Sequence, residues 1–435
     1  MKQFLNKPID NSGLIVFRIL FGLLCFLESA GAIATGWVRR NLVEPEATFN
    51  FIGFDFLQVL QGPYMYWHYA IMSLFGIGIM LGYKYRWSVL AFTLMWTCTY
   101  LMQKSSYNNH YYLLMLLSAL MAVLPANRYA SLDVKFNPSL KSLSMPNWCR
   151  WLIISQLFIV YTFASIAKFY PDWLDGSVMA LLMKSKSHYF LVGELLQQKA
   201  IHYFLSYGGI LFDGLIIPAL LYKPTRKFAF FISIFFHLFN SFIFHIGIFP
   251  YLSLAFSLFF FDAETIRKLF LKKKPSFNPE GKKAFKPAPI LMTGLIIYLI
   301  IQVALPLRHH FIQDDVLWTE EGHRLSWRMM LRAKSGSTTY TVIDKATNNA
   351  IPVNLNDFLS KKQQRTASTK PDVMWQFAHR LKQHFAKEGK DVSVFVKAYV
   401  SVNGKPRKQF TDPTVDIASL PWRRFAHSEW LLPSK

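Results

Sequence analysis

The sequence predicts a polytopic α-helical membrane protein with about nine transmembrane helices, followed by a soluble α+β domain rich in strands. Of its 435 residues, 52% are hydrophobic, only 17% are charged and 40 are phenylalanine. Soluble domains of this size seldom combine so much apolar content with so little charge. Apolar windows of about 18–22 residues recur up to residue 306, and this is the length that a helix needs to cross a hydrocarbon core.

The first predicted span follows Lys2 and Lys7 and ends near SAGA, a pattern that also fits a secretory signal peptide. The length of the apolar run, with Arg18 and Glu28 inside it, favours a retained helix instead. Segment 34–65 mixes aromatic and charged residues and is expected to lie at the membrane interface. The predicted spans are 12–33, 66–83, 87–103, 109–125, 148–167, 206–222, 227–243, 245–261 and 288–306.

Basic residues are unevenly distributed between the connections, and this predicts the orientation. The net charge is +23, and alternate connections place 19 Lys and Arg residues on one side of the membrane and 7 on the other. By the positive-inside rule the N-terminus is cytoplasmic and the region after residue 306 lies on the opposite side. The basic excess is therefore attributed to topology and anionic-lipid contact, and not to nucleic-acid binding. The basic loop 268–287 is expected to supply only this charge.

Residues 307–435 follow a different pattern. Residues 338–344 (TTYTVID) and 392–405 (VSVFVKAYVSVNGK) alternate as strands do, with NGK as a hairpin turn, and 370–388 has the pattern of a helix. The region contains no cysteine, so neither a disulfide framework nor a cysteine-based metal site is predicted there. The three cysteines of the chain lie in or beside predicted spans: Cys25, Cys98 and Cys149.

Polar residues from three predicted spans converge on the outer leaflet. Ionisable groups within a membrane are costly, so each one is a hypothesis of function. Lys168 ends the fifth span, although a lysine at a helix end is usually an interfacial anchor. The others are Asn108, Asn109 and His110 at the start of the fourth span, and His237, Asn240, Ser241 and His245 near the end of the seventh. Such side chains more often bond a neighbouring helix than take part in chemistry.

The chemistry available to such a site follows from the lysine. Burial disfavours the ammonium form, so a desolvated Lys168 could stay neutral and accept a proton from a weak acid. In a lipid-side pocket lined by Phe, Tyr, Met and Asn, that acid is expected to be a lipid-soluble phenol or hydroquinone. The alternative is a non-catalytic membrane scaffold or lipid-binding protein, in which Lys168 and His110 only fix helix packing.

Six stretches carry a family resemblance, in this order: FRILFGLL, YNNHYYLLMLL, QLFIVYTFASIAKFYPDWLDG, FFHLFNSFIFHIGIFPY, WTEEGHRLSWRMM and AYVSVNGKPRKQFTDPTVDI. They resemble the vitamin K-dependent gamma-carboxylases and their bacterial relatives that carry the HTTM membrane domain. The resemblance covers nearly the whole chain. It implies an HTTM-type helical domain over residues 1–306 and an extracytoplasmic α+β domain over residues 307–435.

The resemblance also implies a reaction. Lys168 falls on the base that deprotonates reduced vitamin K or a menaquinol-type naphthoquinone. Dioxygen oxidises the anion to a strong base that removes the γ-proton of a peptide glutamate, and carbon dioxide traps the carbanion, giving γ-carboxyglutamate and quinone epoxide. His110 falls on a catalytically important histidine, with Asn109 beside it to bond oxygen atoms that become negative. The other residues expected at the quinone and peptide chamber are Asn240, Ser241, Phe249, Trp327, Met329 and Met330.

The chain also departs from the animal enzymes of that family. It is shorter, it lacks their cysteine pair, and His323 stands where they have a tyrosine. A quinol epoxidase without carboxylation is therefore the nearer alternative. The same features favour a bacterial cytoplasmic membrane over the endoplasmic reticulum. The expected partners are membrane lipid and a peptide or protein glutamate, without nucleic acid, and no metal is expected.

Overall fold

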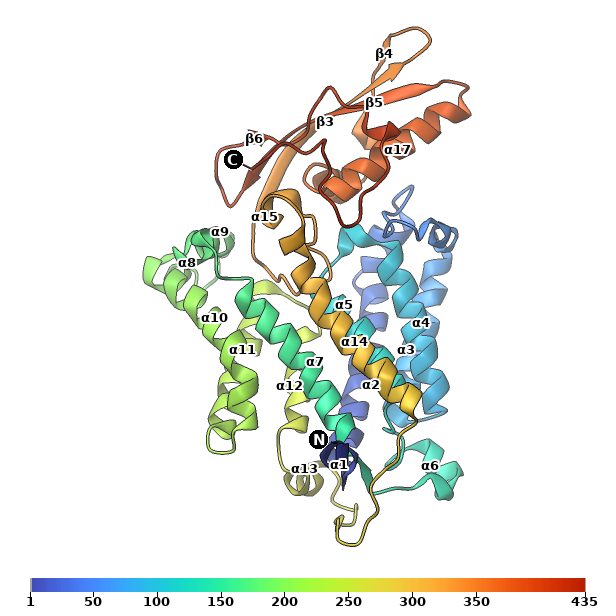
Figure 1. Ribbon diagram of the computed structural model, residues 1–435, viewed down its shortest axis with the longest axis vertical. Helices are drawn as coiled ribbons and strands as arrows, with labels where there is room; N and C mark the ends of the chain where they lie inside the picture. Colours follow the sequence, from blue (N-terminus) through green and yellow to red (C-terminus); the bar gives the residue numbers. More distant parts are fainter. Residues whose placement is uncertain (1, 435) are drawn as a thin grey trace.

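The computed structural model describes residues 2–434 and consists of a helical bundle with a smaller α+β domain packed on one end (Figure 1). Six helices are long and apolar enough to cross a membrane: α2 (Ser12–Ala34), α3 (Tyr64–Leu81), α7 (Asn147–Ile166), α10 (Lys199–Leu221), α11 (Arg226–Phe244) and α14 (Pro289–Leu307). Three more are shorter or less apolar: α4 (Tyr85–Met102), α5 (Asn109–Val123) and α12 (Phe249–Ala255). Each predicted span overlaps one of these helices.

The predicted span at 245–261 begins later than its apolar pattern indicates. His245 and Gly247 adopt left-handed backbone conformations, with φ of +51° and +60°, and they separate α11 from α12. The 3-10 helix η6 (Phe256–Phe259) continues α12. A left-handed residue cannot continue a right-handed helix, so the chain turns here before it re-enters the bundle.

Short elements connect the helices at both ends of the bundle. Strands β1 (Pro8–Asp10) and β2 (Ser144–Pro146) pair antiparallel, with Ile9 opposite Met145. Segment 34–65, which is predicted to be interfacial, contains the π-helix η1 (Arg39–Val43) and the 3-10 helix η2 (Asp55–Leu60). The remaining short elements are α1 (Lys2–Asn6), η3 (Lys104–Ser106), α6 (Leu132–Phe136), η4 (Pro138–Leu140), α8 (Pro171–Leu174), α9 (Ser177–Lys184), η5 (Leu195–Gln197), α13 (Ala263–Phe270), η7 (Arg308–Phe311) and α15 (Val316–Thr319).

Helix α2 packs closely on α3 because two glycines let their backbones approach. A Cβ on Gly22 would collide with the backbone of Met80, and one on Gly76 would lie 2.6 Å from the backbone nitrogen of Phe26. Arg18, also on α2, is fully buried. Its guanidinium donates to the backbone carbonyls of Met80, Ala126, Tyr129 and Ala130. The four bonds to the two terminal nitrogens stabilise a charge that would otherwise be costly inside the bundle, whereas Nε has no partner within residues 2–434.

The C-terminal domain is a four-stranded antiparallel sheet covered by helices. The strand order is β4 (Ala350–Ile351), β3 (Lys334–Asp344), β5 (Val392–Val402) and β6 (Lys408–Gln409). The other elements are η8 (Leu355–Asp357), α16 (Lys361–Ala367), α17 (Pro371–Lys387) and η9 (Ile417–Ser419). The long strands and the helix predicted from the sequence pattern are present. Alternate valines of β5 are buried, and with Tyr340 and Phe377 they form the core between the sheet and α17.

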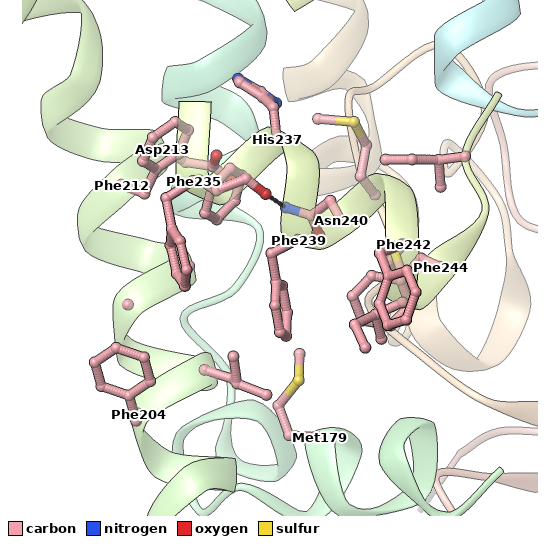
Figure 2. A pocket seen from close by; sticks show the side chains of 18 of the residues that line it. Met179, Phe204, Phe212, Asp213, Phe235, His237, Phe239, Asn240, Phe242 and Phe244 are labelled. Atoms are coloured by element: carbon pink, nitrogen blue, oxygen red, sulfur yellow. Dashed lines mark hydrogen bonds between the residues drawn. The ribbon is translucent and has the colours of Figure 1, made fainter. Parts of the chain in front are cut away.

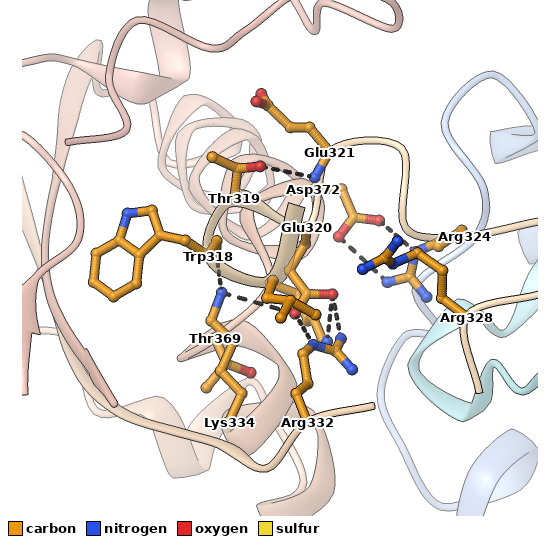
Figure 3. A network of polar contacts seen from close by, with 12 residues as sticks. Trp318, Thr319, Glu320, Glu321, Arg324, Arg328, Arg332, Lys334, Thr369 and Asp372 are labelled. Atoms are coloured by element: carbon orange, nitrogen blue, oxygen red, sulfur yellow. Dashed lines mark hydrogen bonds and ion pairs between the residues drawn. The ribbon is translucent and has the colours of Figure 1, made fainter. Parts of the chain in front are cut away.

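Two buried ionic clusters join this domain to the bundle and to the segment between them (Figure 3). In the first, Asp372 on α17 bonds Lys104 at 2.9 Å and Arg324 at 3.1 Å. Burial alone would raise the pKa of Asp372, but Arg324 and Lys104 together hold it well below its usual value. Burial lowers the pKa of Lys104 to about 8, against the opposing effect of Asp372. The first cluster therefore connects the end of α4 to α17.

In the second cluster, one carboxylate faces three cations, of which Figure 3 labels Arg332 and Lys334. Glu320 forms ion pairs with Arg332, with Lys370 at 2.7 Å and with Lys334 at 3.8 Å. Burial lowers the pKa of Lys334 to about 7 and that of Lys370 to about 8, although Glu320 opposes both shifts. The cluster ties the segment after α15 to β3 and α17.

The basic loop 268–287 does more than supply charge, because one of its lysines is buried. Lys274 Nζ lies 2.7 Å from Asp10 Oδ2 and 3.4 Å from the carbonyl oxygen of Leu143. Its side chain is fully buried. The lysine therefore holds β1 and the residue before β2 against the loop.

Replacing this lysine is expected to destabilise the protein. Lys274→Met removes the ammonium and leaves Asp10 without its cation, which is expected to cost about 1.5–3 kcal/mol. Thermal unfolding in detergent is the measurement, and Lys283→Met, at an exposed position of the same loop, is the matched control. Equal melting temperatures for the two variants would contradict a structural role for Lys274.

Candidate active site

A cavity of about 580 Å³ lies among α7, α10, α11 and α12, and Figure 2 shows side chains that line it. Most of its wall is aromatic or aliphatic. The polar side chains that reach it are His110, Tyr161, Lys168, Asp213, His237 and Asn240. An apolar cavity with a few convergent polar groups is the usual form of a small-molecule site.

Lys168 lies on the wall of this cavity and is not exposed as an interfacial anchor would be. Helix α7 ends at Ile166, and the chain turns so that Lys168 is 6% exposed. Its Nζ forms an ion pair with Asp213 and donates to the carbonyl oxygen of Ala164 at 2.9 Å. The ammonium also lies 5.5 Å from the ring centroid of Trp173. The lysine is thus held at one position by three different groups.

Asp213 is a site residue that no sequence motif singles out. It lies in the middle of α10, buried, and its only ion pair is with Lys168 among the described residues. The sequence does carry a signal for it, since a lone carboxylate within an apolar span is rare and usually functional. Gly209, one turn earlier, leaves room beside the lysine, because a Cβ there would lie 3.8 Å from Lys168 Cε.

Two histidines face the cavity with an unpaired ring nitrogen each. The His110 ring stacks on Phe249 with centroids 4.3 Å apart, and its Nε2 is buried and has no partner within residues 2–434. The sequence places His237 near the outer end of its span but assigns it no catalytic or binding role. Its Nε2 lies 3.2 Å from the hydroxyl of Tyr161. Its Nδ1 likewise finds no partner in the described chain. Both rings can therefore bond a polar ligand in the cavity.

Three more predicted residues also line the cavity. Met329 and Met330 form part of its wall, together with Asn240. The amide of Asn240 donates to the carbonyl oxygen of Phe236 on its own helix at 2.8 Å (Figure 2). Its carbonyl oxygen is thus the part of the side chain left for a ligand.

Asn109, Ser241 and Trp327 do not line this cavity, contrary to their predicted place at the chamber. The Asn109 amide donates to the carbonyl oxygen of Arg328 at 3.1 Å, so it fastens α5 to the segment behind the cavity. Ser241 points to Tyr251, with hydroxyl oxygens 3.5 Å apart. Trp327 is buried against Tyr112, with ring centroids 4.8 Å apart. Their contacts are those of residues that support the wall.

The segment that carries the two methionines is under backbone strain. Leu325, Trp327 and Met330 all have positive φ, between +52° and +59°. This conformation costs about 1–3 kcal/mol for each residue other than glycine, and such residues cluster at functional sites. The backbone N–H of Leu325 donates to the hydroxyl of Tyr107 at 2.7 Å, which helps to hold the segment in place.

Fold and cavity together define a helical membrane protein with a buried lysine–carboxylate pair in an apolar chamber. Comparison with known families then identifies the class: the HTTM domain family matches residues 6–264, and the family described as vitamin K-dependent gamma-carboxylase, lumenal domain, matches residues 287–435. The chain therefore belongs to the vitamin K-dependent gamma-carboxylase family. No solved structure matches it. Within residues 2–434, no group of three or more His, Cys, Asp or Glu side chains could hold a metal ion.

Proposed function

We propose that this protein is a vitamin K-dependent gamma-carboxylase-like enzyme that couples oxidation of a reduced naphthoquinone by dioxygen to carboxylation of a peptide glutamate by carbon dioxide. The observation that carries the proposal is the buried pair of Lys168 and Asp213 at the wall of an apolar cavity of about 580 Å³. Family membership supports the carboxylase class. The residues at the cavity support the use of a quinol.

Lys168 is the proposed base, and Asp213 explains why it can act in a dry site. A neutral lysine that takes up a proton becomes an ammonium, which is costly in a low-dielectric environment. Beside an ionised Asp213 the resulting pair carries no net charge, so the carboxylate stabilises the protonated lysine. The ion pair with Asp213 is the protonated form of this base. The pair therefore has to lose one proton before the proton of a bound substrate hydroxyl can move to Nζ of Lys168.

The cavity, of about 580 Å³ with a mostly apolar lining and a few polar groups, has the polarity that a naphthoquinone requires. A reduced naphthoquinone supplies the weakly acidic hydroxyl and the electrons that reduce dioxygen. His110 Nε2 and His237 Nδ1, which have no partner within residues 2–434, can bond its oxygen atoms. Phe204, Phe235 and Phe242 line the cavity and are also 61–66% exposed on the surface of α10 and α11. The cavity therefore reaches the surface that faces lipid, where an isoprenoid chain is soluble.

The proposed setting is a bacterial cytoplasmic membrane with the N-terminus inside. The unequal distribution of basic residues supports this orientation, which puts the C-terminal domain and the cavity on the extracytoplasmic side. A peptide glutamate would then approach from outside the cell and the quinol from the membrane. The mostly apolar walls from α10 and α11, with Met329 and Met330, limit the access of water, which would quench a strong base and a carbanion.

The proposal is tested with purified protein, reduced naphthoquinone, oxygen, labelled bicarbonate and a glutamate peptide. Epoxide formation with label in the peptide is the expected result. Epoxide without label would replace the carboxylase by a quinol epoxidase. Absence of epoxide with both vitamin K hydroquinone and menaquinol would favour a non-catalytic scaffold or lipid-binding protein.

Filling the cavity beside the lysine is expected to weaken quinol binding. Gly209→Ala adds a methyl group at ordinary contact distance from Trp173 and Lys168, so it should leave the kinetics nearly unchanged. Gly209→Leu extends further into the cavity and is expected to raise KM for quinol about tenfold, in keeping with the few kcal/mol that overpacking costs. KM values within twofold for the two variants would show that the substrate binds elsewhere.

A further inference from the structure

Asn403, in the turn between β5 and β6, is bonded to two segments outside its hairpin. It is 7% exposed and has a left-handed backbone, with φ of +55°. Its backbone N–H donates to the carbonyl oxygen of Ala333 at 2.8 Å, and its side-chain oxygen accepts from the N–H of Ala333 at 3.0 Å. Its side-chain amide donates to Asp172 Oδ2 at 2.9 Å. One side chain thus joins three parts of the chain.

Asp172 is the partner on the side of the membrane domain. It lies four residues after Lys168, in the first turn of α8, and is 9% exposed. Its second oxygen bonds Lys405 Nζ at 2.7 Å. The hairpin turn also packs on α9, since a Cβ on Gly404 would lie 3.5 Å from the methyl groups of Leu181. The turn at 403–405 therefore holds the carboxylate from two sides.

Ala333, the third partner, continues the strained segment of the cavity wall. It lies three residues after Met330, which lines the cavity. The hydroxyl of Tyr170 donates to the carbonyl oxygen of Leu331 in the same stretch. The lysine turn (residues 168–172) and the wall segment (residues 329–333) are thus fastened to each other and to the hairpin.

We propose that Asn403 is a positioning residue for Lys168: it clamps the lysine turn to the wall segment so that Nζ faces the cavity. The inference rests on the proposed role of Lys168 as the base. An Asn-Gly turn is by itself a common hairpin turn, and turn propensity would account for the left-handed backbone. It does not account for a side chain whose polar atoms all bond Asp172 and Ala333 outside the hairpin.

The test first removes the hydrogen-bond donor that Asn403 offers to Asp172 and then restores the bond with donor and acceptor exchanged between the two residues. Asn403→Asp keeps the size, the tolerance of a left-handed backbone and the acceptor for Ala333, but it places a carboxylate against Asp172. Amide hydrogen exchange of residues 166–174 is expected to become about tenfold faster. The kcat for epoxide is expected to fall about tenfold to a hundredfold with little change in KM for quinol, because the lysine is misplaced and the cavity is intact.

Adding Asp172→Asn to Asn403→Asp restores one donor and one acceptor between the two positions and keeps one negative charge in the clamp that Lys405 joins. Both the exchange rate and kcat are expected to return to within about threefold of the natural protein. The matched control is Asn348→Asp, at an exposed left-handed asparagine in the turn between β3 and β4, which should change neither quantity.

Two results would overturn the inference. One is Asn403→Asp with unchanged exchange at 166–174, and the other is a double variant that melts like the natural protein but remains slow. Hydrogen exchange is measured without substrate, so it tests the clamp separately from the reaction. If the natural protein formed no epoxide, the proposed function would fail while the exchange data still decided whether the clamp exists.

Discussion

Lys168→Ala is expected to lower kcat for epoxide formation by about 10²–10⁴-fold, which is the usual contribution of a general base. The methyl side chain cannot accept a proton, and no other amine lines the cavity within residues 2–434. Epoxide formed per enzyme under saturating quinol and oxygen is the measurement. If label enters the glutamate peptide with the natural protein, its incorporation should fall in parallel, since one deprotonation starts both reactions.

The control for this experiment must separate chemistry from folding. Lys168→Ala leaves Asp213 buried without its cation, which by itself is expected to cost about 3–5 kcal/mol of stability. The double variant Lys168→Met with Asp213→Leu removes both charges and should melt close to the natural protein while remaining inactive. A stable double variant with full turnover would rule out Lys168 as the base. If the natural protein has no redox activity and Lys168→Ala and His110→Ala lower only the melting temperature, a scaffold is favoured.

Asp372→Ala is expected to cost about 3–5 kcal/mol, because it leaves Lys104 and Arg324 buried without a counter-charge. Thermal unfolding of the full chain in detergent is the measurement. The matched control is Asp391→Ala, which breaks a pair with Lys345 at the surface and should cost about 0–1 kcal/mol. Equal melting temperatures for the two variants would show that the first ionic cluster does not hold the domains together.

The first ionic cluster also makes the stability of the protein depend on pH, and the pKa of Asp372 sets the direction of this dependence. The pKa of Asp372 is lower in the folded protein than its usual value, so the folded state binds fewer protons. Its contribution to stability is therefore complete above about pH 4, the ordinary pKa of aspartate, and is lost as pH falls further. Asp372→Ala should remove part of the acid-induced loss of stability seen in the natural protein.

Much of the fold could be predicted because the length of an apolar run indicates a membrane-spanning helix, and alternation of apolar and polar residues indicates a strand. Every apolar window that predicts a span overlaps a helix, and the alternating residues at 338–344 and 392–402 form the two long strands. The boundary near residue 244 between the two predicted spans is present, since α11 ends at Phe244. The left-handed turn at His245 and Gly247, which delays the start of α12 to Phe249, was not predictable from hydropathy because both flanks are apolar.

Part of the site was also predictable. Lys168 and His110 line one cavity, as convergence at one membrane depth indicates, and Phe249, which the family resemblance places at the chamber, lines it too. Helix ends on the same side of a membrane lie at similar depth. Residues on these ends are therefore close to each other along the membrane normal, whatever their separation within the membrane plane. Depth does not tell which helices are neighbours, so Asn109 and Ser241 were expected at the chamber and lie behind or beside it. Trp327, expected there from the family resemblance alone, also lies outside the cavity wall.

The sequence by itself determined that this chain is a membrane protein of helices with a strand-rich C-terminal region, and it determined which family it belongs to. Only the tertiary structure decided that Lys168 meets Asp213, that Asn403 bonds Asp172, and that Lys274 is buried against Asp10. The partners in these pairs are 45, 231 and 264 residues apart. Hydrophobic periodicity assigns each residue a face and a depth, whereas an ion pair needs two side chains within about 4 Å, a distance that only the packing of the helices and domains sets.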